Sequence, residues 1–155
     1  MEFNEQNLVT PHRISGKMSE DLEKQVLELI LEALKNEIAH HDYLGRLKDM
    51  TEDDHEKGLI EAMRLDEQKH HMLLSDIYYD IKGCAPIVDT YEKSICNCVV
   101  SEFARSILGK LENQEFYKML LFAVSGMARD LIFDIMDDEG RHAAQFNYLF
   151  TKNKG

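Results

Sequence analysis

Proline, cysteine and long hydrophobic runs are all scarce in this chain, and each shortage excludes a class of protein. The 155 residues include only two prolines, Pro11 and Pro86, so long stretches are free of helix breakers. The three cysteines, Cys84, Cys96 and Cys98, do not make the even framework of a disulfide-stapled domain, and the paired Cys-x-x-Cys knuckles of a zinc ribbon are missing. We expect free, partly buried thiols, with a soft-metal site at the Cys-x-Cys as the alternative.

The sequence also lacks the segments that carry a protein into or across a membrane. No run approaches the roughly 18 apolar residues of a membrane span, and the start Met1-Glu2-Phe3-Asn4-Glu5 has no basic-then-apolar signal pattern. We therefore expect a cytoplasmic protein. Lys and Arg number 18 against 29 Asp and Glu, which gives a formal charge of −11. This balance argues against a nucleic-acid or anionic-membrane partner.

What remains is the composition of one helical domain, with 44% hydrophobic and 30% charged residues. Residues 1–18 lack helical periodicity and are predicted to form a flexible arm. A helix is predicted from Ser19 to about Met50, and a second from Thr51, as its capping residue, to Gly83. A third is predicted from about residue 89 or 90 to 124, and a fourth from 125 to 152. Residues 19–152 are thus predicted to form an all-α four-helix bundle, with the connection around 83–90 as its crossover.

The motif Asp-Glu-x-x-His occurs twice, as Asp66-Glu67-Gln68-Lys69-His70 and as Asp138-Glu139-Gly140-Arg141-His142. On a helix, residues three apart lie side by side, so a carboxylate and an imidazole at this spacing can bind one cation. Apolar residues precede and follow each Glu at helical spacing, which places each Glu on the core face of its helix. Two such helices that face each other can hold a pair of metal ions.

Two further Glu-x-x-His pairs differ in their surroundings. Glu37, three residues before His40, has apolar neighbours at the same spacing and is predicted to face the core. Glu52, three residues before His55, lies in an acidic run and is predicted to be solvated. Buried carboxylates are costly unless they are paired or bound to metal. Three core-facing Glu residues, two of them with an inward His, therefore favour a metal site; buried Glu–His and Glu–Lys pairs are the alternative.

The first two predicted helices also resemble the last two. At an offset of 73 residues, the apolar positions of the first helix match those of the third, while Glu37 becomes Lys110 and His41 becomes Gln114. A register shifted by two would offer Glu112 in place of Lys110, but it matches the flanking residues less well. The bundle is therefore predicted to consist of two helix-hairpin repeats, with Lys110 or Glu112 opposite Glu37.

At these residues the chain resembles the ferritin-like superfamily, specifically its rubrerythrin branch. The stretch 66–86 is similar to the second helix of that family, and the stretch 137–149 to the fourth. The resemblance covers roughly residues 22 to 150 and implies one Glu from each of the first and third helices and a Glu-x-x-His from each of the others. Carried over position by position, it implies metal ligands at Glu37, Glu67, His70, Glu139 and His142, with Glu112 as the alternative ligand on the third helix and Lys110 and Tyr117 as residues that modify the site.

The resemblance also implies cofactors and partners. The expected cofactor is iron, as two ions, or as one if Lys110 blocks the second position; manganese or zinc are possible occupants. The rubredoxin-like cysteine module of rubrerythrins is absent, so a separate protein would donate the electrons. A homodimer is expected, without nucleic-acid or membrane partners.

Two functions are compatible with these residues. The resemblance implies an oxidoreductase that reduces peroxide or oxidises ferrous iron, with Tyr117 and Tyr43 beside the site and His41 as a residue that could orient a ligand. In the second, the bundle keeps its frame but has lost redox chemistry, because the Lys110 ammonium supplies the charge that an ion would supply. That protein would be a structural, sensing or single-metal-binding module. Either way, a buried Lys110 should be held by one or more of the carboxylates.

Overall fold

The computed structural model describes residues 18–155, and four helices account for most of them. They are α1 (Glu20–Met50), α2 (Asp54–Lys82), α3 (Val99–Ala123) and α4 (Gly126–Asn153). The predicted arm at 1–18 lies almost wholly outside the described residues. The Ser19 hydroxyl caps α1 by accepting a hydrogen bond from the Leu22 amide, as predicted. The all-α four-helix bundle predicted from the sequence is confirmed.

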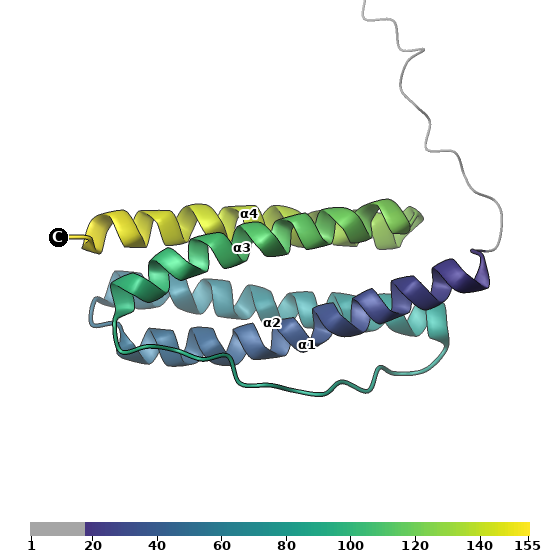
Figure 1. The fold of residues 1–155 in the computed structure, drawn as a ribbon, viewed down its shortest axis with the longest axis horizontal. Helices are drawn as coiled ribbons and strands as arrows, with labels where there is room; N and C mark the ends of the chain where they lie inside the picture. The colour runs from purple at the N-terminus through teal and green to yellow at the C-terminus, as the bar shows by residue number, and fades with distance from the viewer. Residues whose placement is uncertain (1–17) are drawn as a thin grey trace, which may run out of the picture.

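The helices pack as two hairpins, α1 with α2 and α3 with α4 (Figure 1). Short connections join the helices within each hairpin, and a long connection, residues 83–98, runs along the bundle from the end of α2 to the start of α3. Across the interface between the hairpins, α1 also contacts α3, and α2 also contacts α4. Each hairpin therefore brings one copy of the Asp-Glu-x-x-His motif to the shared interior.

The predicted start of the third helix near residue 89 or 90 is wrong, because α3 begins at Val99. The connection has to return along the length of α2, which has 29 residues and is therefore about 43 Å long. The predicted connection, about seven residues from Gly83 to the expected helix start, would span only about 23 Å when extended. The observed connection, the 16 residues of 83–98, can span about 53 Å. Only an extended crossover of nearly this length can place α3 parallel to α2.

The start of the second helix also differs by a few residues from the prediction. Thr51 is the C-cap residue of α1, and its hydroxyl donates a hydrogen bond to the Leu47 carbonyl. The N-cap residue of α2 is Asp53, whose side chain accepts a hydrogen bond from the Glu56 amide. Both Thr and Asp are good capping residues, so local sequence alone did not separate them. Gly83 ends α2 in the left-handed conformation at φ 80°, as the Gly–Pro stop predicted.

The apolar core is divided into two clusters, one toward each end of the bundle. A layer of buried polar side chains, from Glu37, Glu67, His70, Lys110, Glu139 and His142, lies between them. Each fully buried Leu, Ile or Phe contributes about 1.5–3 kcal/mol relative to exposure. The first cluster includes Val26, Ile30, Leu34, Leu74, Tyr117, Leu120, Ile132 and Ile135, and the second consists of Tyr43, Leu44, Leu47, Ile60, Met63, Phe103, Phe146 and Leu149.

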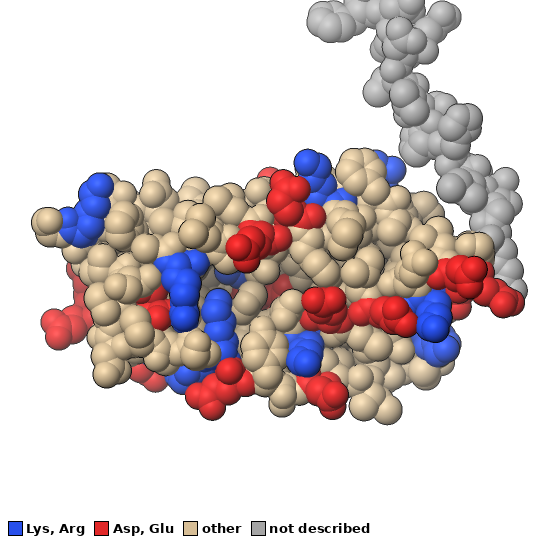
Figure 2. Space-filling view, in the orientation of Figure 1, with Lys and Arg blue, Asp and Glu red and all other residues tan. Residues whose placement is uncertain are grey.

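On the face drawn in Figure 2, acidic and basic side chains are interspersed over the bundle. Among the described helices, none combines the length and apolar character that crossing a membrane requires. Cys84, Cys96 and Cys98 are free, as expected, but they are exposed and not partly buried. All three lie on the crossover, and Cys96 and Cys98 fall in the part of it that was predicted to be helical.

Candidate metal centre

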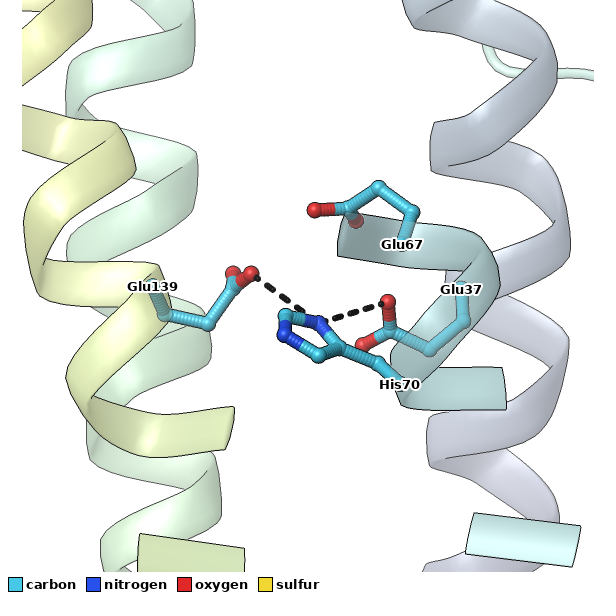
Figure 3. Close-up of side chains that lie close together, drawn as sticks. All are labelled: Glu37, Glu67, His70 and Glu139. Carbon is cyan, nitrogen blue, oxygen red and sulfur yellow. Dashed lines mark ion pairs between the residues drawn. The ribbon is translucent and has the colours of Figure 1, made fainter. Parts of the chain in front are cut away.

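Four buried side chains from three helices converge between the two apolar clusters. Glu37 of α1, Glu67 and His70 of α2 and Glu139 of α4 each offer one ligand atom, and these four atoms all lie within 4.8 Å of one another. All four side chains point toward the interior of the bundle, with Glu139 reaching across from the second hairpin (Figure 3). Oxygen and imidazole donors at this spacing form a set that can hold a metal ion.

Four fully buried atoms, on three of these side chains and on His142, have no hydrogen-bond partner. They are Oε2 of Glu37, Oε2 of Glu67, Nδ1 of His70 and Nδ1 of His142. His70 Nδ1 lies 3.4 Å from Glu37 Oε2 and 3.9 Å from Glu139 Oε1. A buried polar atom without a partner is costly. Unpartnered donor atoms that face one another around a common point therefore fit a cation between them.

Each histidine is oriented by the aspartate of the opposite motif. His70 Nε2 lies 3.0 Å from Asp138 Oδ2, and His142 Nε2 lies 2.9 Å from Asp66 Oδ2. A neutral imidazole that donates from Nε2 presents its lone pair at Nδ1, which is the atom facing the carboxylates. The Asp that precedes Glu in both motifs thus fixes the ring tautomer suited to binding a metal. The rings of His70 and His142 stack with their centroids 6.1 Å apart.

Lys110, and not Glu112, occupies the position on α3 opposite Glu37. Its side chain is buried, and Nζ donates to Glu67 Oε1 at 2.6 Å and to Glu139 Oε1 at 3.0 Å. Glu112 is exposed, so the register shift that offered it as a ligand is wrong. Because helical positions two apart point about 200° away from each other, burying Lys110 turns Glu112 toward solvent.

His142 lies on the Lys110 side of this cluster. Its Nδ1 is 3.3 Å from Glu67 Oε1 and 3.4 Å from Glu139 Oε1, the same two oxygens that accept from Lys110. Lys110 and His142 therefore approach the same two carboxylate oxygens. The opposite side of the cluster, toward Glu37 and His70, contains no ammonium.

The remaining hydrogen bonds support the carboxylates. The Tyr117 hydroxyl donates to Glu37 Oε1 in a short hydrogen bond. The Asn113 amide donates to Glu139 Oε2 at 2.8 Å and lies 3.3 Å from Nδ1 of His40, whose Nδ1 is 3.5 Å from Glu67 Oε2. Tyr117 thus hydrogen-bonds a candidate ligand and lies beside the site, as predicted.

Two other residues considered from the sequence lie outside the cluster. His41 does not orient a candidate ligand, because its Nε2 lies 2.7 Å from an Arg64 nitrogen on α2. Tyr43 donates to Glu102 at 2.6 Å, and Glu102 also accepts from the Cys96 amide at 2.9 Å. Tyr43 and Glu102 therefore fasten the end of the crossover to the bundle.

The buried charges set the protonation of the site. Burial, reinforced by the charge of Glu67, raises the pKa of Glu37 to about 8. Burial alone would also raise the pKa of Glu67, but the Lys110 ammonium together with His142 and His40 outweighs burial and holds that pKa well below its ordinary value. Burial would lower the pKa of His70, but its hydrogen bond to Asp138 and the nearby Glu37 carboxylate raise it to about 9. Without metal, protons thus occupy the Glu37–His70 side at neutral pH.

Sequence reasoning placed the buried Glu and His residues of the cluster on core faces but missed several that support them. The signal for Asp66 and Asp138 was present, because both motifs begin with Asp, but each pairs with a histidine about 70 residues away. Asn113 gave no signal of its own. The glycine at position 140 leaves room for a neighbouring side chain, because a Cβ there would collide with the Gln114 side chain of α3.

Replacing Asp138 with asparagine should weaken divalent-metal affinity by about 10–100-fold, because His70 loses the carboxylate that fixes its Nδ1 lone pair toward the site. Competition with a fluorescent chelator would measure this. Asp137→Asn is the matched control, since Asp137 is exposed and adjacent and the change in charge is the same. Equal affinities for the two variants would show that Asp138 does not support the ligand.

Comparison of the chain with sequence models of protein families, with curated proteins and with solved structures finds no match.

Proposed function

We propose that this protein is a non-haem iron protein of rubrerythrin type that binds one ion firmly and reduces peroxide or oxidises ferrous iron. The observation that carries the proposal is the set of unpartnered buried atoms on Glu37, Glu67 and His70, which face one another beside Glu139. Oxygen donors with one imidazole suit iron or manganese, whereas zinc would fill the site without redox activity.

The charge of the layer supports one ion in preference to two. Glu37, Glu67 and Glu139 carry three negative charges when ionised, and Lys110 carries one positive charge. The two negative charges that remain match one divalent cation. A second cation beside Lys110 would meet direct repulsion and would lack a fourth carboxylate. The ion is therefore placed among Glu37, Glu67, His70 and Glu139.

The side chains around the ion would contribute binding and protons. Iron bound there would supply one electron on passing from the ferrous to the ferric state. Because reducing one peroxide to water takes two electrons and two protons, a separate donor protein would have to return the iron to the ferrous state twice for each peroxide. Reduction of peroxide consumes protons, and with Glu37 deprotonated as a ligand, the Tyr117 hydroxyl is the proton-bearing group that hydrogen-bonds to it. Lys110 stays protonated because the charges of Glu139 and Glu67 overcome the effect of burial and raise its pKa.

The experiment that tests this function combines metal analysis with turnover. Protein reconstituted anaerobically with Fe²⁺ and desalted should retain one iron per chain and should consume hydrogen peroxide faster than the same concentration of free Fe²⁺, with oxidation of the bound iron. Glu37→Gln should lose the iron and the activity together. Retained iron without peroxide or dioxygen reactivity would contradict the redox function.

The position of Lys110 favours a second candidate, a bundle that has kept the frame of a metal protein without the redox chemistry. Its ammonium already bonds two of the three buried carboxylates, at 2.6 and 3.0 Å. In this case the protein would act as a structural or sensing module. Protein purified both aerobically and anaerobically would then contain no metal, and it would take up none from an excess of Fe²⁺ or Mn²⁺.

Metal affinity should rise steeply with pH. In the metal-free fold, the pKa of His70 is about 9 and that of Glu37 about 8, above their ordinary values of 6.5 and 4.5. The folded protein therefore holds more protons than the unfolded chain, and it loses stability as the pH rises through these values to 9. Metal must displace these protons, so each proton released raises affinity about tenfold per pH unit. The gain in melting temperature on adding Mn²⁺ should therefore be larger at pH 8.5 than at pH 6.5. A gain that is equal or smaller at pH 8.5 would contradict this protonation scheme.

A further inference from the structure

An ion that reaches a fully buried site has to pass between two neighbouring helices, and at the level of the site the seam between α2 and α4 is closed by ion pairs. Lys69 of α2 lies 2.9 Å from Asp138 of α4, and Arg141 of α4 lies 3.0 Å from Asp66 of α2. The same aspartates hold the histidines. A cation entering here would have to break both pairs and release the ligands.

Two other seams are closed by side chains. Between α3 and α4, the Gln114 side chain lies against Gly140, next to Glu139. Between α1 and α3, the crossover covers the seam, with Lys93 Nζ 4.4 Å from the centre of the Tyr43 ring. The space enclosed behind Lys93 is only about 10 Å³, which is room for no more than one water molecule.

The seam between α1 and α2 is different, because a groove of about 250 Å³ lies directly beside the site. Glu37 and Glu67 line it, although their side chains are only 1% and 0% exposed. One carboxylate oxygen of each, Oε2, has no hydrogen-bond partner. The groove thus borders two buried carboxylates, whose Oε2 atoms lie 3.4 Å from His70 Nδ1 and 3.5 Å from His40 Nδ1. Its lining consists of Glu37, Ile38 and His41 from α1 and Glu67, Gln68 and His71 from α2.

Two histidines line this groove in equivalent positions. His41 follows Glu37 by four residues on α1, and His71 follows Glu67 by four residues on α2, so each ring lies one helical turn from its carboxylate. Both are partly exposed, whereas the carboxylates are buried. In the described part of the chain, no hydrogen bond engages the His71 ring, and Arg64 alone engages that of His41. Imidazole is a good ligand for divalent iron and for the later first-row transition metals.

We propose that the α1–α2 groove is the entry route for a divalent cation, and that His41 and His71 form an outer site that binds the cation transiently before it passes to Glu37 and Glu67. This inference rests on the proposed metal function and adds a route and two residues to it. The histidines would replace part of the hydration shell of the ion at the mouth. The two unpartnered oxygens would then draw it inward.

Stopped-flow uptake of Co²⁺ tests the route, because the absorption bands of the ion report its binding. His41→Ala/His71→Ala should slow the second-order uptake rate at least tenfold while leaving the final amount of bound Co²⁺ unchanged. Gln68→Phe, at an exposed position lining the groove, should slow it by obstruction. His55→Ala, an exposed histidine that does not line the groove, is the matched control and should bind at the parental rate.

Each result decides between distinct conclusions. Parental uptake rates in both the double-alanine and Gln68→Phe variants would overturn the route while leaving the metal site standing. A lower final amount of bound Co²⁺ in the double-alanine variant would mean that the histidines belong to the equilibrium site, which also overturns the inference. A parent protein that binds no Co²⁺ would overturn the proposed function and the route together.

Discussion

Replacing Lys110 with glutamate is expected to raise the metal content from one divalent ion per chain to two. The change removes the ammonium that bonds Glu67 and Glu139 and supplies a fourth carboxylate from α3, beside the unpartnered Nδ1 of His142. Four carboxylates balance the charge of two divalent ions, as in the Glu-rich sites of di-iron bundles. Anaerobic titration with Fe²⁺, followed by metal analysis after desalting, would measure the content.

Two variants separate the possible causes of such a gain. Lys118→Glu makes the same change in charge at an exposed position of the same helix and should leave one ion per chain. Lys110→Met removes the ammonium without adding a ligand and should also remain at one ion, bound more tightly because the repulsion is gone. An unchanged content in Lys110→Glu would show that Lys110 does not define the capacity of the site.

Removing Glu67 or Glu139 is expected to abolish the stabilisation of the fold by metal. At a free metal concentration 100 times the Kd, binding adds about 2.7 kcal/mol to the free energy of unfolding. For a chain of this size, that corresponds to a rise in melting temperature of roughly 5–10 °C, and a chelator should reverse it. Both carboxylates contribute ligand atoms, so Glu67→Ala and Glu139→Ala should melt at the same temperature with metal as with chelator.

The same variants should also be less stable than the parent without metal. Each substitution takes one partner from the buried Lys110 ammonium, and losing one member of a buried ion pair costs about 3–5 kcal/mol. Glu112→Ala is the control, because its side chain is exposed and its loss should change neither stability nor the effect of chelator. A parent protein whose melting is indifferent to metal and chelator would contradict occupancy of the site.

The sequence was sufficient to predict those parts of the site that depend on helical spacing. Glu37, Glu67, His70, Glu139 and His142 could be placed on core faces because their apolar neighbours repeat with the period of a helix. The 73-residue repeat placed Lys110 opposite Glu37, and the ion pairs of Lys110 agree with that register. Local pattern is strong for such residues because each belongs to a long amphipathic helix.

The parts that the sequence did not predict depend on contacts between distant segments. The crossover is fixed against α1 by hydrogen bonds such as those from Arg46 to the Lys93 carbonyl and from Tyr91 to Asn36. No local sequence pattern predicts these bonds. The pairing of Asp66 with His142, 76 residues apart, exists only once the hairpins are docked. The sequence also left open whether Lys110 or Glu112 faces the interior. The answer depends on which face of α3 packs against α1 and α4, and a two-residue change of register alters that face.

The most direct test of a single-ion site is an anomalous-scattering map from crystals grown anaerobically with saturating Mn²⁺. We expect one peak per chain, within bonding distance of Glu37, Glu67, His70 and Glu139, with the Lys110 ammonium still bonded to Glu67 and Glu139. Two peaks with Lys110 displaced would contradict the role of Lys110 in limiting the site to one ion. A map without any peak among these side chains at saturating metal would contradict the metal centre itself.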